Sequence, residues 1–115
     1  MGFATDYSGA SGRLYTYVIF SAADLHNLPA QGGSYIFAVN DAARTPVFIE
    51  ATNGVRASVM RQGMAEWNVA RTKHGAELVL IHVDPALTMA RRQSEKEDLI
   101  ACYYPPMNTN PDHQQ

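Results

Sequence analysis

The segment AELVLIHV, residues 76–83, decides the fold of this chain because it is the most apolar strand-like run in the sequence. A continuous apolar run of this length is typical of a strand that is buried on both faces. We therefore predict that residues 76–83 form the central strand of a sheet and that the neighbouring segments pack around it.

Helical segments lie on both sides of this strand along the chain. Asp84 is suited to the N-cap of a helix over residues 85–102, whose first residue is a proline. A second helix is expected over residues 53–69, where apolar side chains recur near helical spacing. Gly63 weakens the middle of that helix. The central strand should thus be covered by two helices.

Three further strand-like runs come earlier in the sequence: RLYTYVIF (13–20), SYIFAVN (34–40) and TPVFI (45–49). The last two are joined by residues 41–44, which have the length and polarity of a hairpin connection. A short helical turn is expected within residues 21–28. This order of elements predicts an α/β (α+β) domain with a small mixed, mainly antiparallel central sheet and helices packed on it.

The length of 115 residues, 46% of them hydrophobic, corresponds to one domain. We expect a flexible N-terminus over residues 1–12, a single domain over residues 13–108 and a disordered tail over residues 109–115. No apolar run reaches the ~20 residues of a membrane span, and no secretory signal is recognisable, which predicts a cytoplasmic location. The lone Cys102 is expected to be a buried, inert thiol.

The charge distribution is less even than the net charge of −2 suggests. Four cations in and around the first expected helix oppose a single acidic residue, Glu66, which gives a local charge of +3. Such a cluster fits either a solvated helix face or a surface for nucleic-acid phosphates. The four cations are Arg56, Arg61, Arg71 and Lys73.

Four short segments of the chain resemble the landmark motifs of the GIY-YIG endonuclease domain. They are GSYIF (33–37), VFIEAT (47–52), EDLI (97–100) and YPPMN (104–108). Their order, the intervening helix and their spacing also agree with that family, and the resemblance spans about residues 14–108. It implies the GIY-YIG nuclease fold.

The resemblance also implies a type of site. In that family two hairpin tyrosines, a helix arginine and a glutamate of the last helix cleave phosphodiesters with one divalent cation. A phenol can help to activate water, a guanidinium balances phosphate charge, and a carboxylate holds Mg²⁺. Tyr35 matches the first tyrosine, and Asn108 matches a terminal asparagine that supports the site.

Four positions of the chain depart from this catalytic set. Phe48 lacks the hydroxyl of the second tyrosine, and Glu50 replaces a motif glycine with a bulky anion. Ser58 stands where the family carries its arginine, and Lys96 stands where it carries the metal-binding glutamate. A cation cannot hold Mg²⁺, so these departures predict a catalytically degenerate domain that acts as a binding module and needs no cofactor.

The alternative is a divergent Mg²⁺-dependent endonuclease that cleaves DNA phosphodiesters with a relocated site. Tyr35 would assist the water, Arg61 would balance the phosphate charge, and Glu97 or Glu95 would recruit the metal. Each of these glutamates is one residue away from Lys96, which rotates the side chain by about 100° around a helix. The alternative therefore requires a shift in register.

Two kinds of partner are compatible with a binding module. DNA or RNA could lie along Arg56, Arg61, Arg71 and Lys73. A protein partner or a second copy could instead pair with an exposed edge of the strand at residues 13–20. Three tyrosines in or near this strand, Tyr7, Tyr15 and Tyr17, would add to that surface.

Two further expectations concern individual side chains. Glu50 and Lys96 are opposite in sign and should form an ion pair within about 6 Å if the resemblance holds. The four histidines show no zinc-binding spacing, and His82, in the central strand, is a candidate for a buried hydrogen bond whose partner the sequence does not identify.

Overall fold

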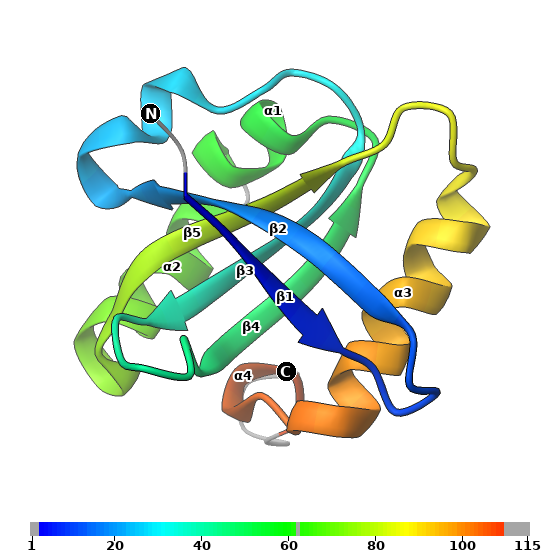
Figure 1. Cartoon of the computed structure of the whole chain (residues 1–115). Coiled ribbons are helices and arrows are strands. Elements are labelled where there is room, and N and C mark those ends of the chain that lie inside the picture. Colours follow the sequence, from blue (N-terminus) through cyan, green and yellow to red (C-terminus); the bar gives the residue numbers. More distant parts are fainter. Residues whose placement is uncertain (1–2, 62, 110–115) are drawn as a thin grey trace.

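The computed structural model of the chain describes residues 3–61 and 63–109. A five-stranded sheet runs through the molecule in the order β1-β2-β5-β3-β4, and every neighbouring pair is antiparallel (Figure 1). The strands are β1 (Phe3–Ser8), β2 (Leu14–Ser21), β3 (Gly33–Val39), β4 (Pro46–Thr52) and β5 (Ala76–Val83). The predicted α+β class is confirmed, and β5 is the middle strand, as expected.

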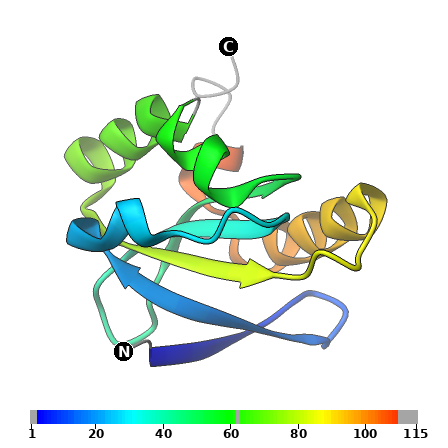
Figure 2. The same cartoon turned by 90° about the horizontal axis from the view of Figure 1, so that it is seen from above.

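Five helical segments accompany the strands in the part of the chain that the structure describes. They are the 3₁₀ helix η1 (Ala22–Asn27) and the α-helices α1 (Val55–Met60), α2 (Gly63–His74), α3 (Met89–Tyr103) and α4 (Pro106–Thr109). Figure 2 shows α1 and α2 next to each other on one side of the sheet, with α3 set apart from them. None of these helices, within the part of the chain that the structure describes, is long and apolar enough to cross a membrane.

The alternation of side chains along the strands builds two separate core clusters. On the side of α1 and α2, Trp67 packs against Phe37 with ring centroids 5.0 Å apart. On the side of α3, Leu99 packs over Tyr17 and Leu80. Because successive residues of a strand point to opposite faces, neighbouring residues of β3 and β5 serve different clusters. The sheet therefore separates two faces, each with its own polar groups at the rim.

The N-terminal segment corrects one prediction. Residues 3–8 form strand β1 instead of part of a loose N-terminus, because Tyr7 is buried and its hydroxyl donates to the carbonyl of Arg44 (2.7 Å). As a result β2 lies between β1 and β5, and the prediction that residues 13–20 expose a strand edge is wrong. Tyr17 is also buried, so the tyrosines do not form one exposed surface.

The helices differ from expectation in their bounds. The helix predicted over residues 53–69 is two helices, α1 and α2, with the second beginning at Gly63, the weak position. Helix α3 begins at Met89 and not at residue 85, because Thr88 is its N-cap and its hydroxyl accepts a hydrogen bond from the Arg91 amide (3.2 Å).

Two further predictions concern Cys102, near the end of α3, and the C-terminal tail. Cys102 is exposed, one turn beyond the last buried residue of α3, Leu99, so the prediction of a buried thiol is wrong. Of the predicted tail, Thr109 is the last residue of α4, and residues 110–115 lie outside the described residues.

Candidate functional site

Tyr35, the motif tyrosine of β3, lies inside the core on the side of α1. It is 2% exposed, and its hydroxyl is 3.3 Å from the hydroxyl of Ser58 on α1. Burial raises the pKa of Tyr35 to about 12, and the nearby carboxylates of Glu50 and Glu66 also raise it. The phenol therefore keeps its proton at neutral pH, so it is a hydrogen-bonding group and not a base.

Phe48 keeps the ring of the second motif position but supplies no polar atom. It lies in β4 with its ring centroid 6.4 Å from that of Tyr35 and 5.7 Å from that of Phe37. The three rings pack together beside α2. The position where the resemblance implies a second hydroxyl thus holds a partly buried ring that packs against the hydrophobic core.

The predicted ion pair between Glu50 and Lys96 is confirmed. Lys96 Nζ on α3 donates to Glu50 Oε1 on β4 over 2.8 Å, and the two side chains are 21% and 31% exposed. Glu50 lies opposite Tyr35 in the register of β4 with β3. The two departed motif positions therefore engage each other across the edge of the sheet.

This pair should contribute modestly to stability. In a double-mutant cycle with Glu50→Gln and Lys96→Met, we expect a coupling free energy of about 1 kcal/mol or less, because both groups retain contact with solvent. Urea unfolding at low and high salt measures it, and the coupling should shrink as salt screens the charges. A coupling that is zero at low salt would contradict the pairing.

Arg61 and Ser58 share an open hollow of about 240 Å³ with the end of β4. Ser58 links this hollow to Tyr35 through their hydroxyl contact. The structure therefore brings together three of the sequence-predicted site residues, Tyr35, Ser58 and Arg61. Neither alternative metal ligand joins them, because Glu97 is exposed on α3 and Glu95 is bonded on the other face of the sheet.

Asn108 serves the backbone of β4. Its side-chain oxygen accepts from the Ile49 amide (2.8 Å), and its side-chain nitrogen donates to the Ile49 carbonyl (2.9 Å). This pairing satisfies both outward-facing polar groups of Ile49 on the edge strand, as another strand would. Asn108 thus has a supporting role and fixes α4 against the hairpin.

The four cations predicted to bind nucleic acid are all exposed on α1, on α2 and just after α1. Arg56 Nε donates to the Leu28 carbonyl (2.7 Å), which anchors that side chain. The guanidinium of Arg71 lies over the ring of Trp67, 5.9 Å from its centroid. Within the described residues, no salt bridge occupies any of the four, so their charge is available to a ligand.

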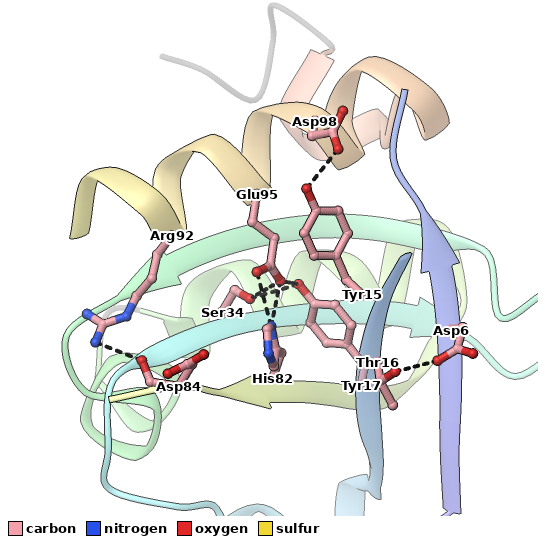
Figure 3. Close-up of polar contacts among 10 residues, drawn as sticks. All are labelled: Asp6, Tyr15, Thr16, Tyr17, Ser34, His82, Asp84, Arg92, Glu95 and Asp98. Carbon is pink, nitrogen blue, oxygen red and sulfur yellow. Dashed lines mark hydrogen bonds and ion pairs between the residues drawn. The ribbon is translucent and has the colours of Figure 1, made fainter. Parts of the chain in front are cut away.

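A second polar cluster, which the sequence analysis did not identify, lies on the α3 face of the sheet (Figure 3). Glu95 points from α3 toward the sheet and is 4% exposed. Its Oε2 accepts from the hydroxyls of Tyr17 (2.6 Å) and Ser34 (2.9 Å), and it is 2.9 Å from His82 Nδ1. Three strands and one helix thus converge on a single carboxylate.

The charges of this cluster support each other. Burial by itself would raise the pKa of Glu95, but the hydrogen bonds from His82, Tyr17 and Ser34 outweigh it and hold that pKa below its ordinary value. The bond to Glu95 raises the pKa of His82 against the opposing effect of burial. Burial and the Glu95 charge raise the pKa of Tyr17. Each partner therefore favours the charged form of the other.

This pair predicts a pH dependence of stability. The lowered pKa of Glu95 adds stability that is lost as the pH falls below its unfolded value of 4.5, and the raised pKa of His82 adds stability that is fully present below its unfolded value of 6.5. The contribution should be largest between these values and should decline as the pH rises above 6.5. Urea unfolding of the wild type and of His82→Gln across pH 4.5–9 measures the difference between their free energies of unfolding. This difference should become smaller at the alkaline end of the range. A difference that does not change with pH would contradict the assignment.

No group of three or more histidine, cysteine or acidic side chains that could hold a metal ion occurs among residues 3–61 and 63–109. Comparison with protein-family models, curated proteins and solved structures gave no significant match to this chain. The functional reading therefore depends on the contacts of the chain's own residues.

Proposed function

We propose that this chain is a GIY-YIG-like domain that binds nucleic acid through α1 and α2 and does not cleave it. The observation that carries the proposal is the ion pair between Glu50 and Lys96, 2.8 Å long. In the family that the chain resembles, these positions hold a glycine and the metal-binding glutamate. In this chain Glu50 stands at the glycine position and Lys96 at the glutamate position. A divalent ion would therefore find no carboxylate at the family's metal-binding position and would be repelled by the positive charge of Lys96.

The other motif positions support the same conclusion. The Phe48 ring is packed into the core, and Tyr35 keeps its proton because its pKa is about 12. Ser58 places a hydroxyl at the position where the family carries an arginine, whose guanidinium would balance the charge of the transition state. The alternative of a relocated Mg²⁺ site would need Glu95 or Glu97 beside Tyr35, and the contacts of Glu95 with His82, Tyr17 and Ser34 disfavour this.

The nucleic-acid part of the proposal is supported by the exposed cations. Arg61, Arg71 and Lys73 lie on or next to α2 and form no salt bridge with another described residue. Phosphate contacts of this kind give binding that weakens steeply with salt and depends little on sequence. Arg61 also borders the hollow beside Ser58, where one backbone phosphate could be held.

Fluorescence anisotropy with labelled single- and double-stranded DNA and RNA tests this proposal. We expect binding that weakens at least tenfold between 50 and 200 mM salt, on the order expected for several phosphate contacts. The double variant Arg61→Gln/Arg71→Gln should weaken binding and reduce the salt slope by about two. Arg44→Gln, which removes an equal charge from the hairpin turn, is the matched control for each single change and should bind like the wild type.

Two outcomes would overturn the proposal. If none of the four nucleic acids binds at 50 mM salt, the cations of α1 and α2 are a solvated helix face, and the partner has to be sought among proteins. If Arg44→Gln weakens binding as much as either single arginine variant, the binding reflects overall charge and not this surface.

A further inference from the structure

A hollow of about 220 Å³ opens beside the Glu95 cluster, on the face of the sheet opposite the cations of α1 and α2. It is formed by the start of β2, the end of β5 and the first turns of α3. Its polar lining includes Arg13, Arg91, Ser94 and His82. A space of this size is smaller than the pockets that hold drug-sized ligands, so it suits one compact polar group.

The guanidinium groups of the two arginines in the hollow, Arg13 and Arg91, are not held by hydrogen bonds or salt bridges to other described residues. They come from different parts of the chain, Arg13 from just before β2 and Arg91 from α3, yet both line the same space. Two unpaired guanidinium groups facing one hollow are suited to hold an anion from two sides.

His82 adds a third donor. Its Nδ1 is held by Glu95, and its side chain is 26% exposed where it lines the hollow. When one ring nitrogen is fixed in this way, the tautomer and the direction of the ring are fixed as well, and Nε2 is the nitrogen left for a ligand. Glu95 is in turn held by Tyr17 and Ser34, so the donor is preorganised.

We propose that this hollow binds the dianionic phosphate group of a phosphate monoester between Arg13, Arg91 and His82. With His82 protonated, the lining of the hollow carries three positive charges, on Arg13, Arg91 and His82, against the one negative charge of Glu95. Asp84 acts on His82 and Asp98 acts on Arg13, so their negative charges offset part of this excess. The hydroxyl of Ser94 provides one more donor at the mouth.

The site should respond to pH through His82. The groups that face His82 are Glu95 on α3, Tyr17 on β2 and Asp84 after β5, and the bond to Glu95 raises its pKa above 6.5. Glycerol phosphate, a monoester that is mostly dianionic at pH 7 and above because its second pKa is about 6, should therefore bind more tightly at pH 7 than at pH 8.5, and the bound phosphate group should raise the pKa of His82 further by linkage. The proposal is independent of nucleic-acid binding by α1 and α2, because it shares no residue with that surface.

Titration of the whole chain with inorganic phosphate, followed by NMR of the backbone amides and the His82 imidazole, tests the site. Chloride replaces phosphate at equal ionic strength as the reference. We expect saturable shifts at Arg13, His82 and Arg91, and Arg91→Gln and Arg13→Gln should each weaken phosphate binding at least tenfold, as expected when one charge-assisted contact is lost. The matched control Arg44→Gln should stay within about twofold, because that side chain is not part of the hollow.

Three further arms identify the ligand chemistry and its source. Glycerol phosphate and a 5′-phosphorylated oligonucleotide both carry a monoester, and binding of either at this hollow supports the proposal and distinguishes a free metabolite from a nucleic-acid end. Dimethyl phosphate carries one charge and should bind at least tenfold more weakly. The proposal is overturned if phosphate shifts nothing beyond the chloride reference, or if dimethyl phosphate binds as tightly as phosphate.

Discussion

Replacing Glu95 with alanine is expected to lower the free energy of unfolding by about 3 kcal/mol. The carboxylate accepts hydrogen bonds from Tyr17, Ser34 and His82, and Tyr17 and Ser34 are almost completely buried. Without Glu95, these donors lose their acceptor in a place that water hardly reaches, and the imidazolium of His82 loses its counterion. Urea unfolding followed by circular dichroism at pH 6 measures the change.

Two variants distinguish this effect from a loss of stability that any substitution on α3 would cause. Glu97→Ala removes an exposed carboxylate two residues along the same helix and should change the free energy of unfolding by less than about 0.5 kcal/mol. Glu95→Gln keeps one acceptor oxygen but no charge, so its loss in free energy of unfolding should lie between those of Glu95→Ala and Glu97→Ala. A loss for Glu95→Ala that is no larger than that for Glu97→Ala would show that the cluster is not a stabilising unit.

Replacing Trp67 with alanine should have an effect of at least similar size, about 3–5 kcal/mol. Trp67 is 2% exposed and is the largest fully buried side chain, and it packs on Phe37 of the central sheet. It also lies under the guanidinium of Arg71. Its removal would leave a large cavity between α2 and the sheet, and the loss is a substantial fraction of the ~5–15 kcal/mol by which domains of this kind are stable.

Thermal unfolding measures this loss, and Trp67→Phe is the control. Phenylalanine fills most of the same space and retains an aromatic face for Arg71, so this variant should lose less than half as much stability as Trp67→Ala. It should also keep the nucleic-acid binding proposed for α1 and α2. If Trp67→Ala unfolds at the same temperature as the wild type, the packing described for α2 is wrong.

The parts of the fold that the sequence predicts well are those with a strong local signal. The apolar run at residues 76–83 matches β5 residue for residue, and the bounds of β3 and β4 lie within three residues of the predicted ones. Strand β1 carries no comparable local signal, because its residues are mostly small or polar and its contacts with the core are distant in sequence: Tyr7 packs against the rings of Tyr17 and Tyr103. A local pattern does not contain such contacts.

The same distinction between local signals and contacts distant in sequence applies to the candidate sites. The pairing of Glu50 with Lys96 could be predicted because the motif positions place both residues at one site. The partner of His82 could not be predicted, because Glu95 lies on a different element, and a shift of a single residue along α3, about 100° around the helix, decides whether Glu95 faces the sheet or solvent. The start of α3 was itself displaced by the Thr88 cap, so its buried face could not be assigned in advance.

The central claim is tested most directly by incubating excess protein with end-labelled DNA and RNA in Mg²⁺, Mn²⁺ or EDTA, and measuring bound and cleaved fractions in the same tubes. The account predicts that the labelled strands are bound at low salt, released at high salt and intact in all three conditions. Cleavage that requires a divalent metal and is lost in Tyr35→Phe would contradict it, because Tyr35 would then act in a working nuclease site.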